Sequence, residues 1–223
     1  MRLTAKNLSL SFGGQVIFKN LSFSAESGEI LAIKGPNGSG KSSLCLCLAG
    51  LMEEGDETAV SGEVYYGGKA LPEMGIAERC ACVGIVFQNP DMQLFSPLVT
   101  EELAFAPENL ALPRDEIKAR IEEAAGICGI KHLLGAKTNR LSGGEKQLVA
   151  IASTLTMKPK FLIADEITSR IDTDKKDIVR NILINFAKEG GGVIMVSHNP
   201  KDLEIAHRVI ELKRGKDYED RSK

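Results

Sequence analysis

A glycine-rich segment that ends in Lys-Ser is the strongest chemical signal in the sequence. Residues 35–42 read GPNGSGKS and match the pattern G-x-x-x-x-G-K-[ST], between the apolar runs EILAIK and SLCLCLAGL. Glycines let successive backbone N–H groups point inward, and a following helix adds its positive end, so such a loop suits a triphosphate. We expect Lys41 to meet the β and γ phosphates and Ser42 to ligate Mg2+. A helix-capping turn would explain some of the glycines, but not Lys41 and Ser42 in register.

Two adjacent carboxylates end a second apolar run. Residues 161–166 read FLIADE. Apolar neighbours cannot hydrate these charges, so the end of this strand needs an ion or solvent nearby. We expect Asp165 to hold the Mg2+ shell and Glu166 to act as general base on an attacking water. Without the glycine-rich loop, an acidic loop start would explain the pair equally well.

The segment LSGGE at residues 141–145 is a third candidate site. Ser142 and Glu145 have the spacing of a capping box at the start of the helix-like run EKQLVAIASTL. The capping box does not account for Gly143 and Gly144. A serine beside bare glycine backbone at a helix N-terminus suits an anion, so we expect this segment to grip a phosphate.

The elements that must position these residues alternate between strands and helices. Short apolar runs suited to buried strands lie at residues 30–33, 83–87, 161–164, 193–196 and 209–212. Amphipathic helices are predicted at 114–128 and from about Asp172 and Asp174 to the glycines at 190–192. The buried faces expected for the two helices consist of Ile117, Ile121, Ala124, Ala125 and Cys128, and of Ile178, Ile182, Leu183 and Phe186. This alternation predicts an α/β fold with a mainly parallel sheet.

Two regions interrupt that alternation. Residues 3–23 and 62–66 look like antiparallel strands with a turn at Gly13-Gly14, and residues 90–157 look mainly helical. We therefore expect one domain over residues 1–223. Its predicted parts are a core with a small antiparallel β subdomain (about 1–88 and 158–213), an inserted helical subdomain (about 89–157) and a solvated, charged tail (214–223).

The composition excludes several classes of protein. Lys plus Arg (28) nearly balance Asp plus Glu (30), so bulk charge gives no case for binding nucleic acid or anionic lipid. The longest apolar run, residues 44–52, is too short to span a bilayer, and the start of the chain has no secretory segment, so we expect a cytosolic protein. The five cysteines are odd in number and lack a C-x-x-C pair, which indicates reduced, mostly buried thiols rather than disulfides or a zinc site.

The segment at 141–145 resembles the signature of the ATP-binding cassette (ABC) ATPases, which have a P-loop NTPase core. The resemblance covers nearly the whole chain and supplies six motifs in order: the phosphate loop at 35–43, the Q-loop Gln88, the signature, the Walker B acids Asp165 and Glu166, the D-loop Asp172 and the switch His198. In that family two cassettes sandwich two ATP molecules, so the implied active unit is a dimer. The nucleotide contacts implied for this chain come from Phe12, Gly35, Asn37, Gly38, Ser39, Gly40, Lys41, Ser42, Ser43, Ser142, Gly143, Gly144 and Asp172.

The resemblance also implies roles for three less distinctive residues. Gln88 would reach Mg2+ and the attacking water, and His198 would hydrogen-bond the γ phosphate and orient Glu166. Taken alone, Gln88 is a polar strand-end residue and His198 a polar loop residue. Phe12 stands where the family places an adenine-stacking aromatic ring, but it shares strand parity with Leu8 and Leu10 and could equally be core.

The segment QNPDMQLF at 88–95 is similar to one in the energy-coupling-factor branch of the family, whose members energise cobalt, nickel and vitamin uptake. An ordinary Q-loop is the alternative. The branch implies a pair of ATPases on the cytoplasmic face of the membrane. They drive a transmembrane coupling protein that docks beside the Q-loop, while a separate membrane subunit binds the vitamin or metal ion. Two rival functions are the ATPase of another ABC transporter type and a soluble nucleotide-gated interaction module. The sequence has neither a long coiled-coil insertion nor a basic patch, which argues against the interaction module.

Several positions depart from the family pattern. Ile167 replaces the usual proline after the catalytic acid, Arg170 lies in the D-loop, and Leu148 stands where an arginine commonly follows the signature. The sequence ends short of the C-terminal extension that many coupling-factor ATPases use to dimerise. These departures bear on pairing with a partner more than on catalysis, and they leave a homodimer and a heterodimer as alternatives.

Overall fold

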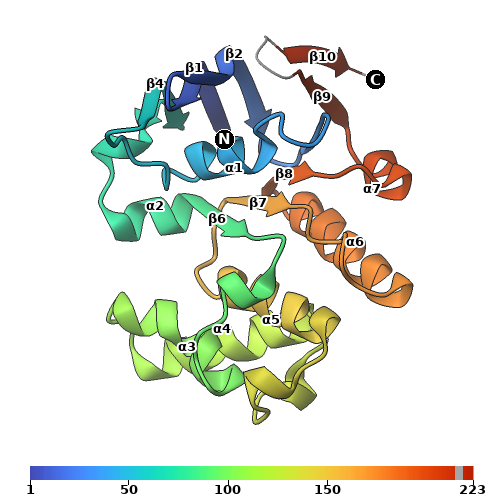
Figure 1. Cartoon of the computed structure of the whole chain (residues 1–223). Helices are drawn as coiled ribbons and strands as arrows, with labels where there is room; N and C mark the ends of the chain where they lie inside the picture. Colours follow the sequence, from blue (N-terminus) through green and yellow to red (C-terminus); the bar gives the residue numbers. More distant parts are fainter. Residues whose placement is uncertain (214–217, 223) are drawn as a thin grey trace.

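The computed structural model describes residues 1–213 and 218–222, whose strands form two sheets (Figure 1). The six-stranded sheet has the order β10-β9-β3-β8-β7-β6, and the four-stranded sheet has the order β2-β1-β4-β5. The strands are β1 (Arg2–Phe12), β2 (Gln15–Glu26), β3 (Ile30–Lys34), β4 (Thr58–Tyr66), β5 (Lys69–Ala70), β6 (Val83–Val86), β7 (Phe161–Asp165), β8 (Gly192–Val196), β9 (Arg208–Leu212) and β10 (Tyr218–Ser222). Parallel pairing of β9, β3, β8, β7 and β6 confirms the predicted α/β class.

The central strands β3, β7 and β8 are short and buried along their length, as continuous apolar runs require when helices cover both faces of a sheet. All five predicted strand runs form strands of this sheet. Because the strands are parallel, the loops that follow β3, β6, β7 and β8 leave from the same edge of the sheet. Open α/β sheets bind ligands at this carboxyl edge.

The β1–β2 hairpin turns where the sequence predicts, at Gly13 and Gly14. These residues have φ of 53° and 77°, and Phe12 pairs with Gln15 across the turn. A two-residue turn that matches the twist of the strands needs positive φ at both positions, which glycine adopts without strain. The hairpin and β4 bury alternate side chains against the central sheet and so form one hydrophobic core together with α1.

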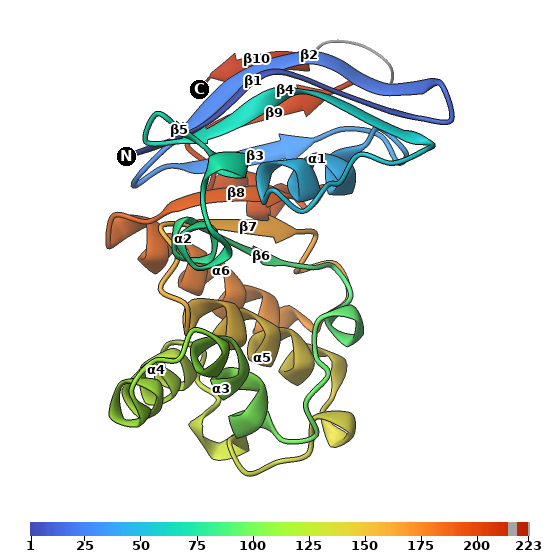
Figure 2. The same ribbon diagram turned by 90° about the vertical axis from the view of Figure 1, so that its left-hand side faces the viewer.

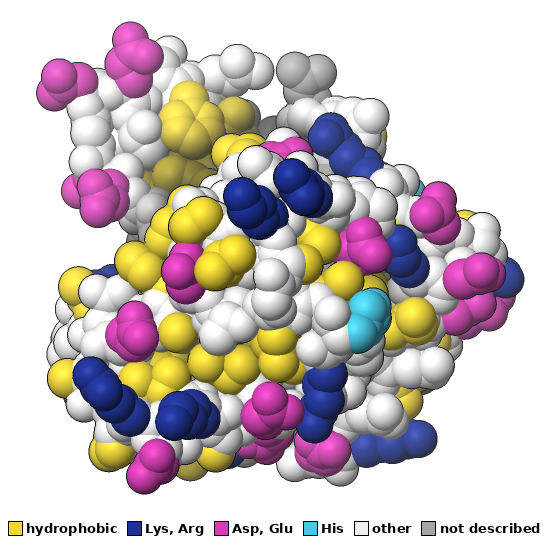
Figure 3. Space-filling model, turned by 90° about the horizontal axis from the view of Figure 1, so that it is seen from below, with side chains coloured by type: hydrophobic (Ala, Val, Ile, Leu, Met, Phe, Trp, Pro, Cys, Tyr) yellow, Lys and Arg dark blue, Asp and Glu magenta, His cyan; other side chains and the backbone are white. Residues whose placement is uncertain are grey.

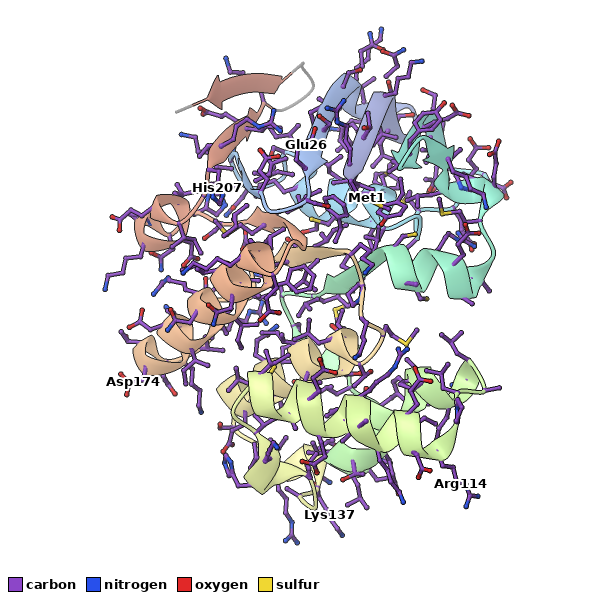
Figure 4. The ribbon with its side chains drawn as sticks, turned by 180° about the vertical axis from the view of Figure 1, so that it is seen from behind. Met1, Glu26, Arg114, Lys137, Asp174 and His207 are labelled. Atoms are coloured by element: carbon purple, nitrogen blue, oxygen red, sulfur yellow. The ribbon has the colours of Figure 1, made fainter. Side chains whose placement is uncertain are left out.

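The helices are α1 (Lys41–Leu48), α2 (Ile76–Cys82), α3 (Val99–Asn109), α4 (Arg114–Ile127), α5 (Gly143–Leu155), α6 (Thr173–Lys188) and α7 (Pro200–Glu204). Helices α3, α4 and α5 lie together below the strands in two perpendicular views (Figures 1 and 2). Seen from behind, Arg114 and Lys137 mark this helical end, and Glu26 lies at the opposite end of the molecule (Figure 4). The predicted apolar stripe of α4 is buried as expected. The predicted division of the chain at about residues 89 and 157 stays a prediction.

Two expectations need correction, and one helix was missed. Ile178 is 42% exposed, because α6 turns Val179, Arg180 and Leu183 inward and leaves Ile178 a quarter-turn away from that face. Helix α2 was not predicted, since its mixed sequence has no clear period. Within the segment expected to be a solvated tail, residues 218–222 pair with β9 as β10, while residues 214–217 and 223 lie outside the described residues.

The expectation that the cysteines are mostly buried is confirmed. All five thiols are free, four are buried, and Cys80 is half-buried. Of the helices in residues 1–213 and 218–222, none combines the length and the hydrophobicity needed to cross a bilayer.

Candidate nucleotide and catalytic site

The phosphate loop joins β3 to α1, and its shape depends on glycine at two close approaches. A Cβ on Gly40 would lie 2.3 Å from Cγ2 of Ile17, and a Cβ on Gly35 would lie 2.3 Å from the carbonyl oxygen of Leu212. Both glycines also have positive φ, at 90° and 157°. The neighbouring strands β2 and β9 therefore press on the loop from two sides and leave no room for a side chain.

Lys41 folds back over this loop. Its Nζ donates to the carbonyl oxygens of Gly35 at 2.9 Å and Pro36 at 3.0 Å, and the residue is 6% exposed. Burial lowers the pKa of the Lys41 ammonium, and the charges of Glu166 and Asp165 act in the opposite direction. A buried cation held only by carbonyl oxygens is ready to exchange them for phosphate oxygens.

Asp165, the last residue of β7, has a carboxylate oxygen without a protein partner. Oδ1 is buried and makes no hydrogen bond, while a hydrogen bond links the carboxylate to Ser42. Burial raises the pKa of the Asp165 carboxyl, the bond to Ser42 lowers it, and the charge of Glu166 raises it further. An unpaired, buried carboxylate oxygen beside a hydroxyl fits a hard divalent cation such as Mg2+. In the described part of the chain no three His, Cys, Asp or Glu residues group into a metal site.

The structure brings Glu166 together with two further predicted residues, Gln88 and His198. Gln88 Nε2 donates to Glu166 Oε2 at 2.9 Å, and His198 Nε2 lies 3.2 Å from Glu166 Oε1. The Glu166 backbone has φ of 48°, in the left-handed region that non-glycine residues rarely occupy, and its N–H donates to the carbonyl oxygen of Val196 at 3.1 Å. Strained backbone of this kind persists where the surroundings over-determine it, and it concentrates at functional sites.

The signature segment starts α5 and has the predicted capping box. Ser142 donates to Glu145 Oε2 at 2.7 Å both from its hydroxyl and from its backbone N–H. These two hydrogen bonds lower the pKa of the Glu145 carboxyl. A residue that sequence reasoning missed, Lys175 of α6, donates from Nζ to Ser142 Oγ at 3.0 Å. Both views place α5 below the strands and α1 among them, so one chain does not bring the signature onto its own phosphate loop (Figures 1 and 2).

Sequence reasoning also missed the side chains that join the Q-loop to α5. Gln93 Oε1 accepts from the N–H of Phe87 at 3.2 Å, and Gln93 Nε2 donates to Thr154 Oγ1 at 3.0 Å. Gln147, 1% exposed, donates to the Phe87 carbonyl oxygen at 3.2 Å. Gln93 lies in the segment QNPDMQLF at 88–95, but the sequence pattern does not say which groups its amide side chain contacts.

Phe12 is 37% exposed, whereas Leu8 and Leu10 are 2% and 1% exposed, so the core alternative for Phe12 is wrong. The β1–β2 register shifts between Leu8 and Leu10 and again after Leu10, and such irregularities break the strict alternation of faces. Asp172 lies exposed at the N-cap of α6 and makes no side-chain capping bond. Adenine stacking by Phe12 and a nucleotide contact by Asp172 stay predictions.

The departures from the family pattern fall into two kinds. Leu148 and Ile167 are 5% and 3% exposed and belong to the core that α5 and β7 share. Arg170 is exposed at the end of the loop that follows Glu166. Only Arg170 therefore lies where a second molecule could contact it directly.

A groove of about 480 Å³ lies beside the Q-loop. Its lining includes four apolar side chains with large exposed fractions, Leu51 (53%), Ile76 (72%), Phe95 (63%) and Phe105 (45%). The rings of Phe95 and Phe105 meet edge to face, with centroids 4.4 Å apart. Figure 3 shows the underside of the molecule, where hydrophobic side chains are spread among charges of both signs and no basic patch forms.

Comparisons with known proteins agree with this geometry. Residues 18–169 match the family described as ABC transporter. The energy-coupling factor transporter ATP-binding protein EcfA of Methanothermobacter thermautotrophicus is 40% identical over 214 residues, 94% of this chain and 67% of that protein. A putative ABC transporter ATP-binding protein of Pyrococcus horikoshii is 40% identical over 203 residues, 91% of this chain and 76% of that protein.

Two solved structures have folds similar to that of this chain. The structure of cbiO1 from Clostridium perfringens, part of the ABC transporter complex cbiONQ, has a TM-score of 0.82 and 34% identity, and the match covers 96% of this chain and 85% of that chain. A dimeric, post-hydrolysis structure of the ATP-binding cassette MJ0796 bound to ADP and Pi has a TM-score of 0.86 and 25% identity, covering 99% and 98%.

Proposed function

This chain belongs to the ABC transporter ATPase family, and from that premise we propose that it energises an energy-coupling-factor importer of a vitamin or a transition-metal ion. The observation that carries the proposal is the position of Glu166, held between Gln88 and His198 at the strand edge that also presents Lys41 and Asp165. Groups that bind phosphate, hold a cation and accept a proton lie together there, and ATP hydrolysis needs all three.

On the phosphate side, Lys41 exchanges its bonds to the Gly35 and Pro36 carbonyl oxygens for bonds to the β and γ phosphates of ATP. Backbone N–H groups of residues 37–42 add neutral donors at the positive end of α1. Phe12, exposed at the tip of the β1–β2 hairpin, stacks on the adenine ring. In this arrangement the phosphate loop binds the charged phosphates of ATP, and the β1–β2 hairpin binds the adenine ring.

On the catalytic side, Ser42, Asp165 and Gln88 would hold Mg2+. The ion would neutralise charge that develops on the phosphates. Glu166 accepts the proton of the attacking water, and His198 orients that carboxylate and hydrogen-bonds the γ phosphate. Gln88 contacts Glu166 directly, so any shift of the Q-loop alters the position of the base.

The site is completed by a second cassette. Helix α5, which begins at the signature residues Ser142, Gly143 and Gly144, lies away from α1 and its phosphate loop (Figures 1 and 2). We infer that these residues grip the ATP bound by a partner subunit together with Asp172. The partner is either a second copy of this chain or a related cassette, and Arg170 lies exposed on the loop next to Asp172.

The energy-coupling-factor branch is supported by the similarity to EcfA and cbiO1 and by the apolar groove beside the Q-loop. We propose that a helix of a transmembrane coupling protein docks in this groove, which places the chain on the cytoplasmic face of the membrane. Gln93 and Gln147 tie the Q-loop to α5, so docking, the position of Gln88 and the position of the signature are mechanically linked.

The catalytic part of the proposal is tested with Glu166→Gln. This change keeps the shape of the side chain and removes its basicity, so we expect hydrolysis to fall by a factor of about 100 or more while ATP binding is retained. Purified variant and wild type are compared by phosphate release and by nucleotide binding, each with the native partner present. Undiminished hydrolysis in Glu166→Gln would remove the role assigned to Glu166.

The transport part is tested by affinity capture of the chain from detergent-solubilised native membranes, followed by mass spectrometry. A coupling protein, a small membrane subunit and a second cassette would support the importer. Capture of a different class of transmembrane protein would support another ABC transporter type. Enrichment of soluble proteins alone would favour a nucleotide-gated interaction module.

A further inference from the structure

A buried carboxylate that no motif predicts joins the two loops of the catalytic edge. Asp202 of α7 is 2% exposed, and its Oδ2 accepts hydrogen bonds from Thr168 Oγ1 at 2.5 Å and Ser197 Oγ at 2.6 Å. Its Oδ1 accepts from Arg180 Nε of α6 at 2.6 Å. Helices α6 and α7 lie side by side in opposite views (Figures 1 and 4).

The two hydroxyl donors stand next to the catalytic pair. Thr168 lies two residues after Glu166, and Ser197 directly precedes His198. Each donor therefore holds the loop on which one member of the Glu166–His198 pair is carried. One carboxylate oxygen of Asp202 accepts from both loops and so sets the spacing between them.

Backbone bonds between the two loops end with the sheet, although the Ser197 N–H still donates to the carbonyl oxygen of Ile33 at 3.3 Å. Glu166 is bonded to Val196 by its N–H, but beyond that residue β7 and β8 no longer pair, and Glu166 itself has left-handed backbone. The direction that the two loops take after the sheet ends is therefore open to side-chain control, and the Asp202 bonds lie at that point.

The network is neither a ligand site nor an efficient way to stabilise a fold. The space enclosed beside it measures about 10 Å³, scarcely enough for one water molecule. Replacing a buried ion pair such as Arg180–Asp202 by packed apolar residues is often neutral or stabilising, so such pairs are weak evidence of a stabilising role. Arg180 supplies the opposite charge on Oδ1 of Asp202, and both hydroxyls donate to Oδ2.

We propose that Asp202 is a positioning residue for ATP hydrolysis, holding Glu166 and His198 at the separation the reaction needs through Thr168 and Ser197. The proposal rests on the function assigned above to Glu166 and His198. Misplacing a reacting group by about 1 Å can cost about 100-fold in rate. In Asp202→Asn the charge is lost and one of the two acceptor oxygens becomes an NH2 donor, so Arg180 or the two hydroxyls lose the acceptor they share in the wild type. We therefore expect kcat to fall about 10- to 100-fold while the KM for ATP changes less than about threefold.

A matched series separates positioning from folding. Thr168→Val keeps the shape and removes the hydroxyl, and we expect it to lower kcat, whereas Thr168→Ser keeps the hydroxyl and should restore the rate to within about twofold. Asp177→Asn is the control, because Asp177 bonds Arg180 at 2.6 Å without touching either hydroxyl and should leave kcat unchanged. Equal rates for Thr168→Val and Thr168→Ser would overturn the proposal.

A double-mutant cycle supplies the decisive readout. If Asp202 acts through the spacing of the Glu166–His198 pair, Asp202→Asn has a smaller effect on kcat once His198→Ala is present, because only its hold on the Glu166 loop is left. A structural role predicts the same fold-loss in both backgrounds, and that result would refute the positioning role.

A second measurement does not depend on turnover. Crystal structures of wild type and Asp202→Asn compare the separation of Glu166 Oε1 and His198 Nε2, which is 3.2 Å here. A clear lengthening in the variant supports the proposal, and an unchanged distance contradicts it. Should the wild type with its native partner fail to hydrolyse ATP, the proposed function falls, while this distance still shows whether Asp202 sets the spacing of the two side chains.

Discussion

Lys175 of α6 holds the hydroxyl of Ser142 at 3.0 Å, so a cation from one element lies on the segment that is expected to grip a phosphate on another. A Cβ on Gly144 would lie 2.3 Å from Cδ of Lys175, which shows how closely the lysine stem passes over the bare backbone of the signature. The D-loop helix and the signature helix are thereby in direct contact within one chain.

This contact predicts that Lys175 supports ATP-driven dimerisation. An ammonium group beside a phosphate at a partly exposed site contributes about 1 kcal/mol, which corresponds to about fivefold in affinity. Lys175→Met should weaken the dimer by about that factor, measured by sedimentation with ATP in the Glu166→Gln background, and Lys175→Arg should weaken it less. A tighter dimer in Lys175→Met would mean that the lysine holds Ser142 away from the phosphate.

Asp165 predicts a particular pH dependence of stability in the absence of Mg2+ and nucleotide. Burial raises the pKa of its carboxyl in the folded protein, so the folded state binds the proton more tightly than the unfolded state. The stability that this gives is complete below the ordinary pKa of aspartate and is lost as the pH rises through the raised value. Asp165→Asn should therefore raise the melting temperature at pH 7, with a gain that shrinks towards pH 4. An equal gain at both pH values would contradict this assignment.

We expect replacement of Gly40 by alanine to lower the free energy of unfolding by more than backbone strain alone would. An alanine there would strain a residue with φ of 90° and would also collide with Ile17 at 2.3 Å. We expect Gly40→Ala to cost about 2 to 4 kcal/mol, the sum of backbone strain and overpacking. Gly14→Ala is the matched control, since Gly14 has φ of 77° and nothing within 4 Å of an added Cβ. Urea unfolding of both variants measures the difference, and equal losses would remove the contribution of the contact.

If the membrane partner docks in the groove, a substitution in the groove should weaken docking without affecting ATP binding. Phe105→Ser removes one ring of the Phe95–Phe105 pair and should abolish capture of the membrane partner while leaving ATP binding unchanged. Ile127→Ser is the control, because Ile127 is equally exposed (46%) but lies outside the groove. Loss of capture in both variants, or in neither, would count against docking at this groove.

Local patterns predicted the parts of this molecule that depend on local physics. The five apolar strands, the hairpin at Gly13-Gly14 and the capping box of Ser142 all follow from runs of residue types over a few positions. The order of motifs was enough to predict that Gln88, Glu166 and His198 lie together, since each follows a strand of one parallel sheet.

Contacts between distant segments could not be predicted in the same way. Gln93 and Thr154 are 61 residues apart, and Thr168 and Asp202 are 34 apart, so their meeting depends on how α5 and α7 pack against the sheet. The orientation of α6 failed for the same reason: Ile178 and Val179 are both apolar, and only the packing of the helix on β3 and β8 decides which of the two is buried.

The strand order gives the chain a demanding folding route. Within residues 1–213 and 218–222, β3, which carries the phosphate loop, pairs only with β8 and β9. Ile30 therefore meets Val193 and Leu31 meets Arg208 across more than two-thirds of the chain. Parallel contacts of such long range form slowly, because the entropy of closing a large loop is lost before the contacts can stabilise the chain. During synthesis on the ribosome, both edges of β3 stay without their sheet partners until residues beyond 192 have emerged, which makes the nascent cassette a natural client for chaperones.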